Sequence, residues 1–233
     1  MWTTMYAVGL DYSDTPTAEQ RTAVMNFYES LAILMPCVDC RTGYRESLVT
    51  YPLSVYSTER PRLCNWLVTI QNATNSKLQK PEVTLDTIVS TKLSGDNRQT
   101  TEMKRYMWMS IYCIVVDYAD TPTAEEQAAI KQFFQSLYTV MPGSACKVMY
   151  QAALDKYPID NSISSKTELW KWLVLVNNDI NGRVNKPAVT MESIISALNS
   201  AKPTPNTISV QMNARQQIKN RHIPVAHKRC CGR

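Results

Sequence analysis

The feature that most constrains the fold of this chain is an internal repeat with a constant shift of 106 residues. The segment DYSDTPTAEQ at residues 11–20 returns as DYADTPTAEE at residues 117–126. Aligned without a gap, residues 1–90 and 107–196 are identical at 34 of 90 positions. A period of this length corresponds to one domain and not to one turn of a solenoid, so the sequence predicts two copies of the same folded unit.

Composition and helix signals predict an all-α fold. Only six of the 233 residues are Gly, and strong helix formers fill the long stretches between them. In each copy a long helix is expected to begin at a Thr-Pro pair, Thr15–Pro16 or Thr121–Pro122, as N-cap and first helical residue. An apolar stripe follows at spacings of three and four residues, and Pro36 or Pro142 should end the helix. The stripe consists of Ala23, Phe27, Leu31 and Leu34 in the first copy and of Ile130, Phe133, Leu137 and Val140 in the second.

The other helix signals complete a four-helix bundle with a short fifth helix in each copy. In the first copy we expect a helix around residues 1–10, one from the cysteine pair to Tyr51–Pro52, and a short one around residues 84–93. The remaining long helix carries Leu63, Trp66, Leu67 and Ile70 on its inner face. The expected domains are a first bundle over 1–93, a linker over 94–106, a second bundle over 107–197 and a basic tail over 198–233.

The formal net charge of +5 is carried by the C-terminal tail. After Glu192 there are seven Lys and Arg and no acidic residue, so residues 1–192 have a net charge of −2. The tail has no aromatic residue to stack on bases, which argues against sequence-specific nucleic-acid binding and leaves a solvated tail or docking on an acidic surface.

The N-terminus lacks the basic region of a signal peptide, and the apolar run Met107–Val116 is too short to span a bilayer. We therefore expect a soluble cytoplasmic protein.

Seven cysteines, an odd number, favour a reducing compartment over a framework of structural disulfides. Cys37 and Cys40 form a CxxC after Pro36 at the start of a helix, where backbone N–H groups and the helix dipole favour a thiolate. In such a pair one thiol attacks a disulfide and the other resolves the mixed intermediate. Half of a zinc site is the alternative, but no second Cys or His pair lies at zinc-finger spacing in the body of the chain, so no metal is expected. Cys64 and Cys113 lie in apolar stretches and should be buried and inert.

Many residues of the first copy agree in type and spacing with one family, and the pattern resembles the Erv/ALR family of FAD-linked sulfhydryl oxidases. The residues that carry the resemblance are Trp2, Tyr12-Ser13-Asp14-Thr15-Pro16-Thr17, Phe27, Pro36-Cys37-Val38-Asp39-Cys40, Trp66-Leu67 and Gln71-Asn72-Ala73-Thr74-Asn75-Ser76-Lys77-Leu78-Gln79-Lys80-Pro81. The second copy matches over the same length with Trp108, Tyr118, Pro122, Phe133, Pro142, Trp172, Asn178, Asn181, Lys186 and Pro187.

The resemblance implies a mechanism and a cofactor. Substrate protein dithiols would reduce a Cys37–Cys40 disulfide, with Cys37 as the interchange thiol, and Cys40 would deliver electrons to FAD, which oxygen reoxidises. The residues implied in FAD binding are Trp2, Tyr6, Tyr12, Trp66, Gln71, Asn72, Asn75 and Lys80, of which the aromatic faces suit stacking and Lys80 suits a phosphate. Family members work as dimers of this bundle, so the two copies are expected to form an intramolecular pseudo-dimer. Cys230 and Cys231 in the tail are candidate shuttle thiols, or, with His222 and His227, a metal site.

The sequence departs from the family pattern where two histidines line the flavin. Tyr6 and Gln71 stand there in the first copy, and Tyr112 and Asn177 in the second.

In the second copy Gly143 also replaces the first cysteine of the CxxC and leaves Cys146 alone, so that copy should be structural. Two functions stay open: an FAD-dependent thiol oxidase with a catalytic first copy, or an inactive structural or assembly protein, for example a minor virion or capsid component, that keeps the fold without flavin. Large DNA viruses carry small cytosolic members of this family, which by analogy places the protein in host cytoplasm and virion, with virion proteins as partners.

Overall fold

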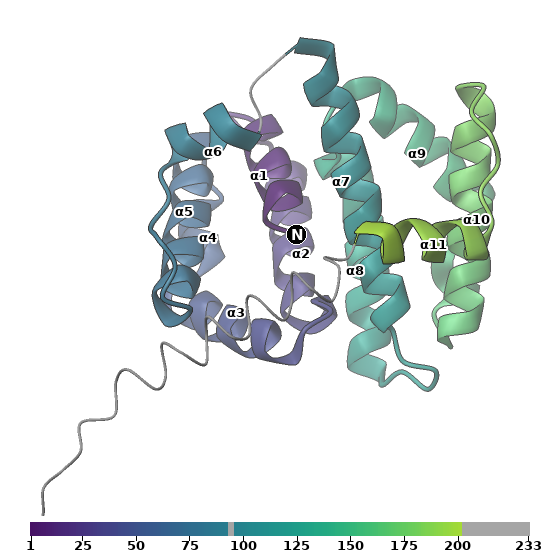
Figure 1. Ribbon diagram of the computed structural model, residues 1–233, viewed down its shortest axis with the longest axis horizontal. Coiled ribbons are helices and arrows are strands. Elements are labelled where there is room, and N and C mark those ends of the chain that lie inside the picture. The colour runs from purple at the N-terminus through teal and green to yellow at the C-terminus, as the bar shows by residue number, and fades with distance from the viewer. Residues whose placement is uncertain (93–95, 202–233) are drawn as a thin grey trace, which may run out of the picture. The chain divides into compact units, whose positions relative to one another are not determined.

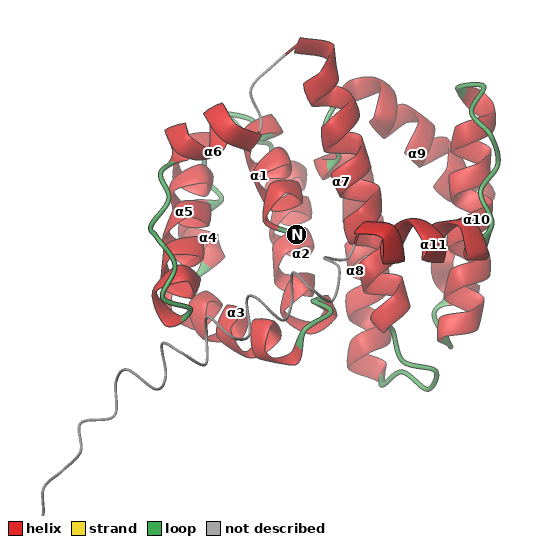
Figure 2. Ribbon diagram, viewed as in Figure 1, coloured by secondary structure: helices red, strands yellow, loops and turns green. Residues whose placement is uncertain are grey.

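A computed structural model of the chain describes residues 1–92 and 96–201, with side chains described for 1–90 and 103–200. Within these ranges every regular element is a helix (Figure 2), which confirms the predicted all-α class. No helix in this part of the chain combines the length and the apolar character that a membrane span requires. The predicted basic tail, with Cys230 and Cys231, lies almost wholly outside the described residues.

Each copy contains four long helices and a shorter last one, as predicted (Figure 1). The first copy comprises α1 (Trp2–Asp11), α2 (Ala18–Leu34), α3 (Val38–Thr50), α4 (Leu53–Tyr56), α5 (Arg60–Lys77) and α6 (Leu85–Lys92). The second comprises α7 (Asp96–Asp117), α8 (Ala124–Val140), α9 (Ser144–Lys156), a 3-10 turn (Ile159–Ser162), α10 (Lys166–Arg183) and α11 (Met191–Ala201). The single helical turn α4 and the 3-10 turn at the equivalent place were not predicted.

The long helices α2 and α8 begin after the Thr-Pro pairs that were expected to start them, so this prediction is wrong. The N-cap of α2 is Thr17, whose Oγ1 accepts a hydrogen bond from the N–H of Gln20 at 3.2 Å. The N–H of Thr17 in turn donates to Gln20 Oε1 at 2.9 Å. Thr123 and Glu126 form the same reciprocal pair at the start of α8. This capping box satisfies two N–H groups at once, which the earlier Thr cannot do.

The segment 94–106, predicted as a linker, is helical from Asp96 onward because α7 runs without a break to Asp117. Residues 96–117 contain no Gly or Pro that would interrupt a helix. Residues 1–194 form one compact unit that includes most of both copies, and residues from 195 form a second unit. The predicted boundaries between the bundles stay a prediction.

The two copies meet through equivalent surfaces, which forms the predicted pseudo-dimer within residues 1–194. Helices α2 and α8 make the most extensive helix–helix contact in the described part of the chain. At its centre Phe27 stacks on Phe133, with ring centroids 5.5 Å apart and ring planes at 24°. Both residues occupy the same position of the repeat. The same relation holds for two hydrogen bonds of 2.8 Å, one between the hydroxyls of Thr4 and Ser110 and one from Gln132 Nε2 to Asn26 Oδ1. Contacts between a residue and its own equivalent are typical of a two-fold interface.

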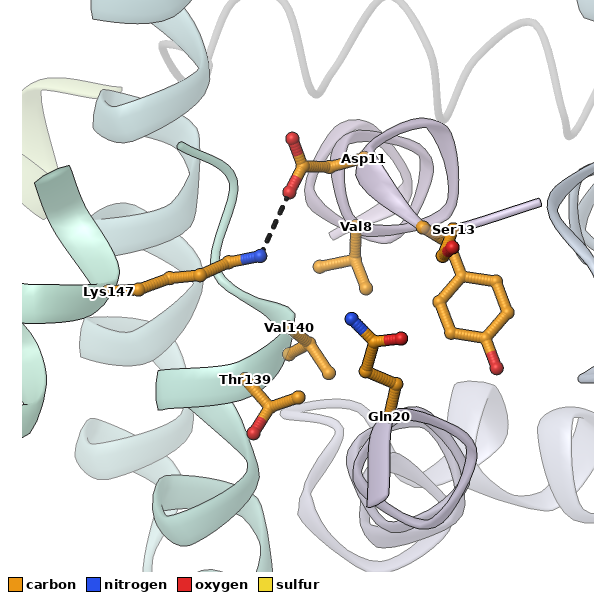
Figure 3. Close-up of a pocket in the computed structure, with 8 residues that line it drawn as sticks. Val8, Asp11, Ser13, Gln20, Thr139, Val140 and Lys147 are labelled. Atoms are coloured by element: carbon orange, nitrogen blue, oxygen red, sulfur yellow. Dashed lines mark hydrogen bonds and ion pairs between the residues drawn. The ribbon is translucent and has the colours of Figure 1, made fainter. Parts of the chain in front are cut away.

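Two ion pairs at the edge of this interface obey the same symmetry. Lys147 Nζ lies 3.2 Å from Asp11 Oδ2, and Arg41 Nη1 lies 3.0 Å from Asp117 Oδ2. Each pair borders a cavity of about 20 Å³, and Figure 3 shows the one beside Asp11. Partly exposed ion pairs contribute at most about 1 kcal/mol each, so they orient the copies while apolar packing supplies the stability.

The apolar positions predicted from helical spacing form the core. All eight residues of the α2 and α8 stripes are at most 8% exposed, and the four inner residues of α5 are fully buried. Cys64 is buried as expected, but Cys113 is only half-buried, so the prediction for Cys113 is wrong. Cys113 lies beside the buried stripe of α7, which runs through Met107, Ile111 and Val115.

Replacing Phe133 by Ala should destabilise the whole protein. Truncating a buried Phe costs about 3–5 kcal/mol, and here it also removes the stack on Phe27. Urea unfolding followed by circular dichroism should show one earlier transition for both copies, because they share this contact. Gln135→Ala, at an exposed position of the same helix, is the control and should change stability by less than about 0.5 kcal/mol. Equal effects of the two substitutions would contradict the central role of the stack.

A second prediction concerns Gln79, which has a left-handed backbone (φ 52°) just after α5, as does its equivalent Asn185 (φ 53°) after α10. This conformation strains most side chains by about 1–2 kcal/mol, and Asn tolerates it better than Gln. Gly removes the strain but loses about 0.5–1 kcal/mol through the entropy of the unfolded chain. Gln79→Gly should therefore raise the free energy of unfolding by about 0.5–1 kcal/mol. Asn185→Gly should give a smaller gain in the same measurement, and a larger gain would contradict this account.

Candidate functional site

Cys37 and Cys40 lie at the N-terminus of α3 and are joined by a disulfide, with their Cα atoms 5.1 Å apart. Cys37 is the N-cap of the helix, and the backbone N–H of Cys40 donates to Cys37 Sγ at 3.2 Å. Both residues are exposed. A substrate thiol can therefore reach the disulfide from solvent. The N–H of Cys40 also supports negative charge on the sulfur of Cys37 once the disulfide opens.

Arg41 fixes this end of α3 against both copies. Its Nη1 donates to the carbonyl oxygen of Met35 at 2.7 Å and to Asp117 Oδ2 at 3.0 Å. The residue was not singled out from the sequence. The repeat does contain the signal, because a basic residue follows the second motif position in both copies and the two acidic partners are also equivalent.

Two of the buried polar atoms of the first bundle that lack a hydrogen-bond partner belong to predicted flavin residues. They are the hydroxyl of Tyr6 on α1, a residue with no exposed surface, and Oε1 of Gln71 on α5, a residue 5% exposed. Burial, with a smaller contribution from Cys64, raises the pKa of Tyr6 well above its ordinary value, so the hydroxyl keeps its proton. An unpaired buried polar group costs about 1–3 kcal/mol. These atoms therefore mark a place that fits a ligand with its own donors and acceptors, beside Trp2, whose ring lies 6.5 Å from that of Tyr6.

In the second copy the equivalent residues, Tyr112 and Asn177, are hydrogen-bonded to each other. Asn177 Nδ2 donates a hydrogen bond to the hydroxyl of Tyr112. Burial raises the pKa of Tyr112 to about 12, and the hydrogen bond from Asn177 counteracts part of this rise. The amide of Asn177 thus binds the tyrosine, whereas in the first copy the hydroxyl of Tyr6 and Oε1 of Gln71 have no partner.

Two other predicted flavin residues use their polar groups within the bundle. The hydroxyl of Tyr12 donates to the carbonyl oxygen of Ser57 at 2.7 Å, and Trp66 Nε1 donates to that of Tyr51 at 2.9 Å. Trp66 is fully buried. Both side chains hold the connections between helices in place, so their polar atoms are not free for a ligand.

The predicted residues Asn72 and Asn75 shape the segment that follows α5. Asn72 pairs with both backbone groups of Val83 at 2.9 Å, and Asn75 Nδ2 donates to the carbonyl oxygen of Pro81 at 2.9 Å. This segment presents Lys80 as an exposed side chain. The asparagines thus act on the first copy's site by positioning the loop that carries the lysine.

The second copy contains a cavity of about 670 Å³. Its lining brings together six equivalents of the predicted site residues of the first copy, namely Trp108, Tyr112, Cys146, Asn177, Asn181 and Lys186. Lys104 and Arg105 also line it. Comparison of the two copies could not find these two, because they precede the aligned residues 107–196 of the repeat.

The cysteines outside the CxxC differ in reactivity. Burial raises the pKa of Cys64 to about 11, with Arg60 counteracting part of the rise, so this thiol is inert near neutral pH. Cys113 and Cys146 are both half-buried, and Cys146 is a free thiol. Among the described side chains, no group of three or more His, Cys, Asp or Glu could hold a metal ion.

Comparison with known proteins identifies the family. The profile of the Erv1/Alr family matches residues 1–93 and again 105–199. The chain belongs to the Erv1/Alr family. It is 31% identical over 94 residues to a probable FAD-linked sulfhydryl oxidase of Acanthamoeba polyphaga mimivirus and 26% identical over 87 residues to a putative one of Invertebrate iridescent virus 3. It is also 25% identical over 103 residues to an FAD-linked sulfhydryl oxidase of Saccharomyces cerevisiae.

These alignments cover 40%, 37% and 44% of this Erv1/Alr chain and 66%, 59% and 52% of the three relatives. The chain therefore spans between half and two thirds of the length of these curated relatives. No solved structure matches it at a significant level.

The two Erv1/Alr copies differ in backbone at the start of the helix that should carry the CxxC. Cys37 caps α3 with an extended backbone at φ −142°, whereas Gly143 caps α9 at φ +88°. The latter conformation is one that side chains rarely adopt. Loss of the cysteine in the second Erv1/Alr copy is thus accompanied by a backbone that favours glycine.

Gln71→Leu should stabilise the ligand-free protein, because it removes a buried acceptor that has no partner. The expected gain in the free energy of unfolding is about 1 kcal/mol, measured by urea unfolding. Asn177→Leu, the matched change in the second Erv1/Alr copy, should instead cost about 1–3 kcal/mol, because it breaks the hydrogen bond to Tyr112. If both variants lost stability equally, the two sites would not differ as described.

Proposed function

We propose that the first copy is an FAD-dependent thiol oxidase that forms disulfides in protein substrates, with oxygen as the final acceptor. The observation that carries the proposal is the exposed Cys37–Cys40 disulfide at a helix N-terminus, in a bundle with unpartnered polar atoms on Tyr6 and Gln71. Membership of the Erv1/Alr family and the similarity to proteins named as FAD-linked sulfhydryl oxidases support it.

The thiol steps follow from the position of the disulfide. A substrate thiolate attacks Cys37 Sγ, the bond between the two cysteines breaks, and its electron pair stays on Cys40 Sγ. A second substrate thiolate then attacks the substrate sulfur of the mixed disulfide and expels Cys37 as a thiolate. The N–H of Cys40, 3.2 Å from Cys37 Sγ, stabilises this leaving group. The substrate dithiol has then lost two electrons and two protons, and the CxxC has gained the two electrons.

The residues of the first copy fit an FAD molecule. Bound FAD would supply the two-electron acceptor for the reduced cysteine pair, with oxygen as oxidant and hydrogen peroxide as product. Tyr6 offers a hydroxyl and Gln71 an amide oxygen, both buried and unpaired. Trp2 offers an aromatic face and Lys80 a cation suited to phosphate.

The second copy then has a structural role. It lacks the cysteine needed for an intramotif disulfide, and Cys146 is a free thiol. Its helix α8 supplies half of the contact at the centre of the pseudo-dimer, and its Asp117 binds Arg41 beside the CxxC. The second copy therefore holds the helix that carries the CxxC of the first copy in position.

A catalytically inactive assembly protein is the second candidate. The polar groups of Tyr12, Trp66 and Asn72 are all satisfied within the bundle, so most of the fold needs no cofactor. Such a protein would bind virion or capsid components, and docking of its basic tail on an acidic surface stays a prediction because the tail is not described.

The decisive experiment uses purified full-length protein. If the proposal holds, added FAD should bind and give a visible flavin absorbance band, and dithiothreitol should drive oxygen consumption in the wild type but not in Cys40→Ser. Cys113→Ser, which removes a thiol outside the site, should keep the wild-type rate. An absence of flavin binding at saturating FAD would sink the oxidase proposal and leave the assembly protein.

A further inference from the structure

We infer that one exposed face of α3, formed by Val38, Thr42, Arg45 and Val49, is a docking surface for substrate proteins. We call it the outer face of α3. The partner that it fits is a protein segment with an apolar side chain about five residues from the reactive cysteine. The inference rests on the proposed function, because it adds a class of substrate to the same disulfide.

The outer face of α3 runs from the disulfide to the last turn of the helix. Its four residues are spaced by four, three and four positions, so they lie on one side of an α-helix. All four are exposed. Val38 follows Cys37 directly, and Val49 is the residue before the last one of the helix. A chain that lies along this face therefore begins at the reactive sulfur.

Both ends of the outer face are apolar. Val38 is 67% exposed and Val49 is 81% exposed, the largest value for a large apolar side chain in the described part of the chain. Between them, Arg45 is drawn towards α2, because its Nε donates to the carbonyl oxygen of Ala32 at 2.9 Å. Valine is a weak helix former, so local helix stability does not favour it at an exposed position. Covering such apolar surface with a partner is favourable.

The second copy provides an internal comparison. The equivalent face of α9 carries Ser144, Val148, Gln151 and Asp155. The Nε2 of Gln151 donates to Asp155 Oδ1 at 2.7 Å. Polar residues thus stand at both ends of this face in the copy that has no CxxC. The apolar ends occur together with the disulfide, which connects them with thiol exchange.

The disulfide determines what covers the outer face of α3. A thiol that attacks Cys37 Sγ brings the neighbouring residues of its own chain to the first turn of the helix, beside Val38. From there Val49 is eleven residues away, or about 16 Å along a helix at about 1.5 Å per residue. An extended chain covers this distance in about five residues at about 3.3 Å each. An apolar side chain at that position can therefore contact Val49.

The test uses two synthetic dithiol peptides that differ only five positions outside each cysteine, with Leu there in one peptide and Ser in the other. Without oxygen, each peptide reduces the Cys37–Cys40 disulfide of the full-length protein. The peptide loses two electrons and two protons and forms a disulfide, and the protein cysteines gain the two electrons. Acid stops the reaction at set times, and alkylation with mass spectrometry measures the opened disulfide. The Leu peptide should react about tenfold faster, because burial of this side chain against Val49 favours its complex by roughly that factor.

Val49→Asp should lower the ratio of the two rates to about one, because the apolar contact is lost. The ratio does not respond to a general change in the reactivity of the disulfide, since such a change affects both peptides equally. Val148→Asp is the matched control, at a 70% exposed valine of α9 in the second copy. This variant should keep the tenfold ratio.

Equal rates of the two peptides with the unaltered protein, or a preference that Val49→Asp leaves intact, would overturn the inference. Light scattering tests another occupant of the outer face of α3. Association of whole chains that Val49→Asp abolishes would assign this face to a second copy of the chain and also overturn the inference. Because the exchange with peptides needs no flavin, failure of the docking surface and failure of the proposed oxidase to bind FAD are separate results.

Discussion

The packing of α2 against α8 around Phe27 and Phe133 is the contact on which the rest of the structure depends. It joins equivalent surfaces, so each copy holds the other in the same way. Two ion pairs then join α3 and α9, the third long helix of each copy, to the first helix of the other copy. They are Arg41 with Asp117 and Lys147 with Asp11. The position of the CxxC is thereby tied to the partner copy. Because both copies belong to one chain, this association does not depend on protein concentration.

Fusion of the copies allows one of them to diverge while the interface is kept. The residues that pair across the interface are the same or similar in both copies, whereas the interiors differ. In the first copy the disulfide is exposed and polar atoms of Tyr6 and Gln71 are unpaired, whereas in the second Tyr112 and Asn177 bind each other beside a large cavity that Lys104 and Lys186 line. A single chain thus carries two bundles of one fold whose interiors differ in chemistry.

Much of the fold could be predicted from the sequence, because helical periodicity and an ungapped repeat are local signals. The apolar stripes and the number of long helices follow from spacing alone. The start of α2 does not, because two Thr residues compete as N-cap and only Thr17 completes a reciprocal pair with Gln20. Family spacing pointed to Tyr12 and Asn72 as ligand residues, but their hydrogen bonds to the backbone depend on the folded loops. That Oε1 of Gln71 has no hydrogen-bond partner likewise depends on the folded structure and cannot be predicted from a sequence pattern.

The backbone at Gly143 has a consequence for the history of the chain. When a cysteine is lost by one substitution, one reverse substitution can restore it only if the backbone has kept its shape. The cap of α9 lies at φ +88°, where a cysteine would be strained by about 1–3 kcal/mol, so a return to a CxxC also requires a change in this backbone. A single substitution at Gly143 therefore places a cysteine on an unfavourable backbone, and this strain disfavours the return of the dithiol motif in the second copy.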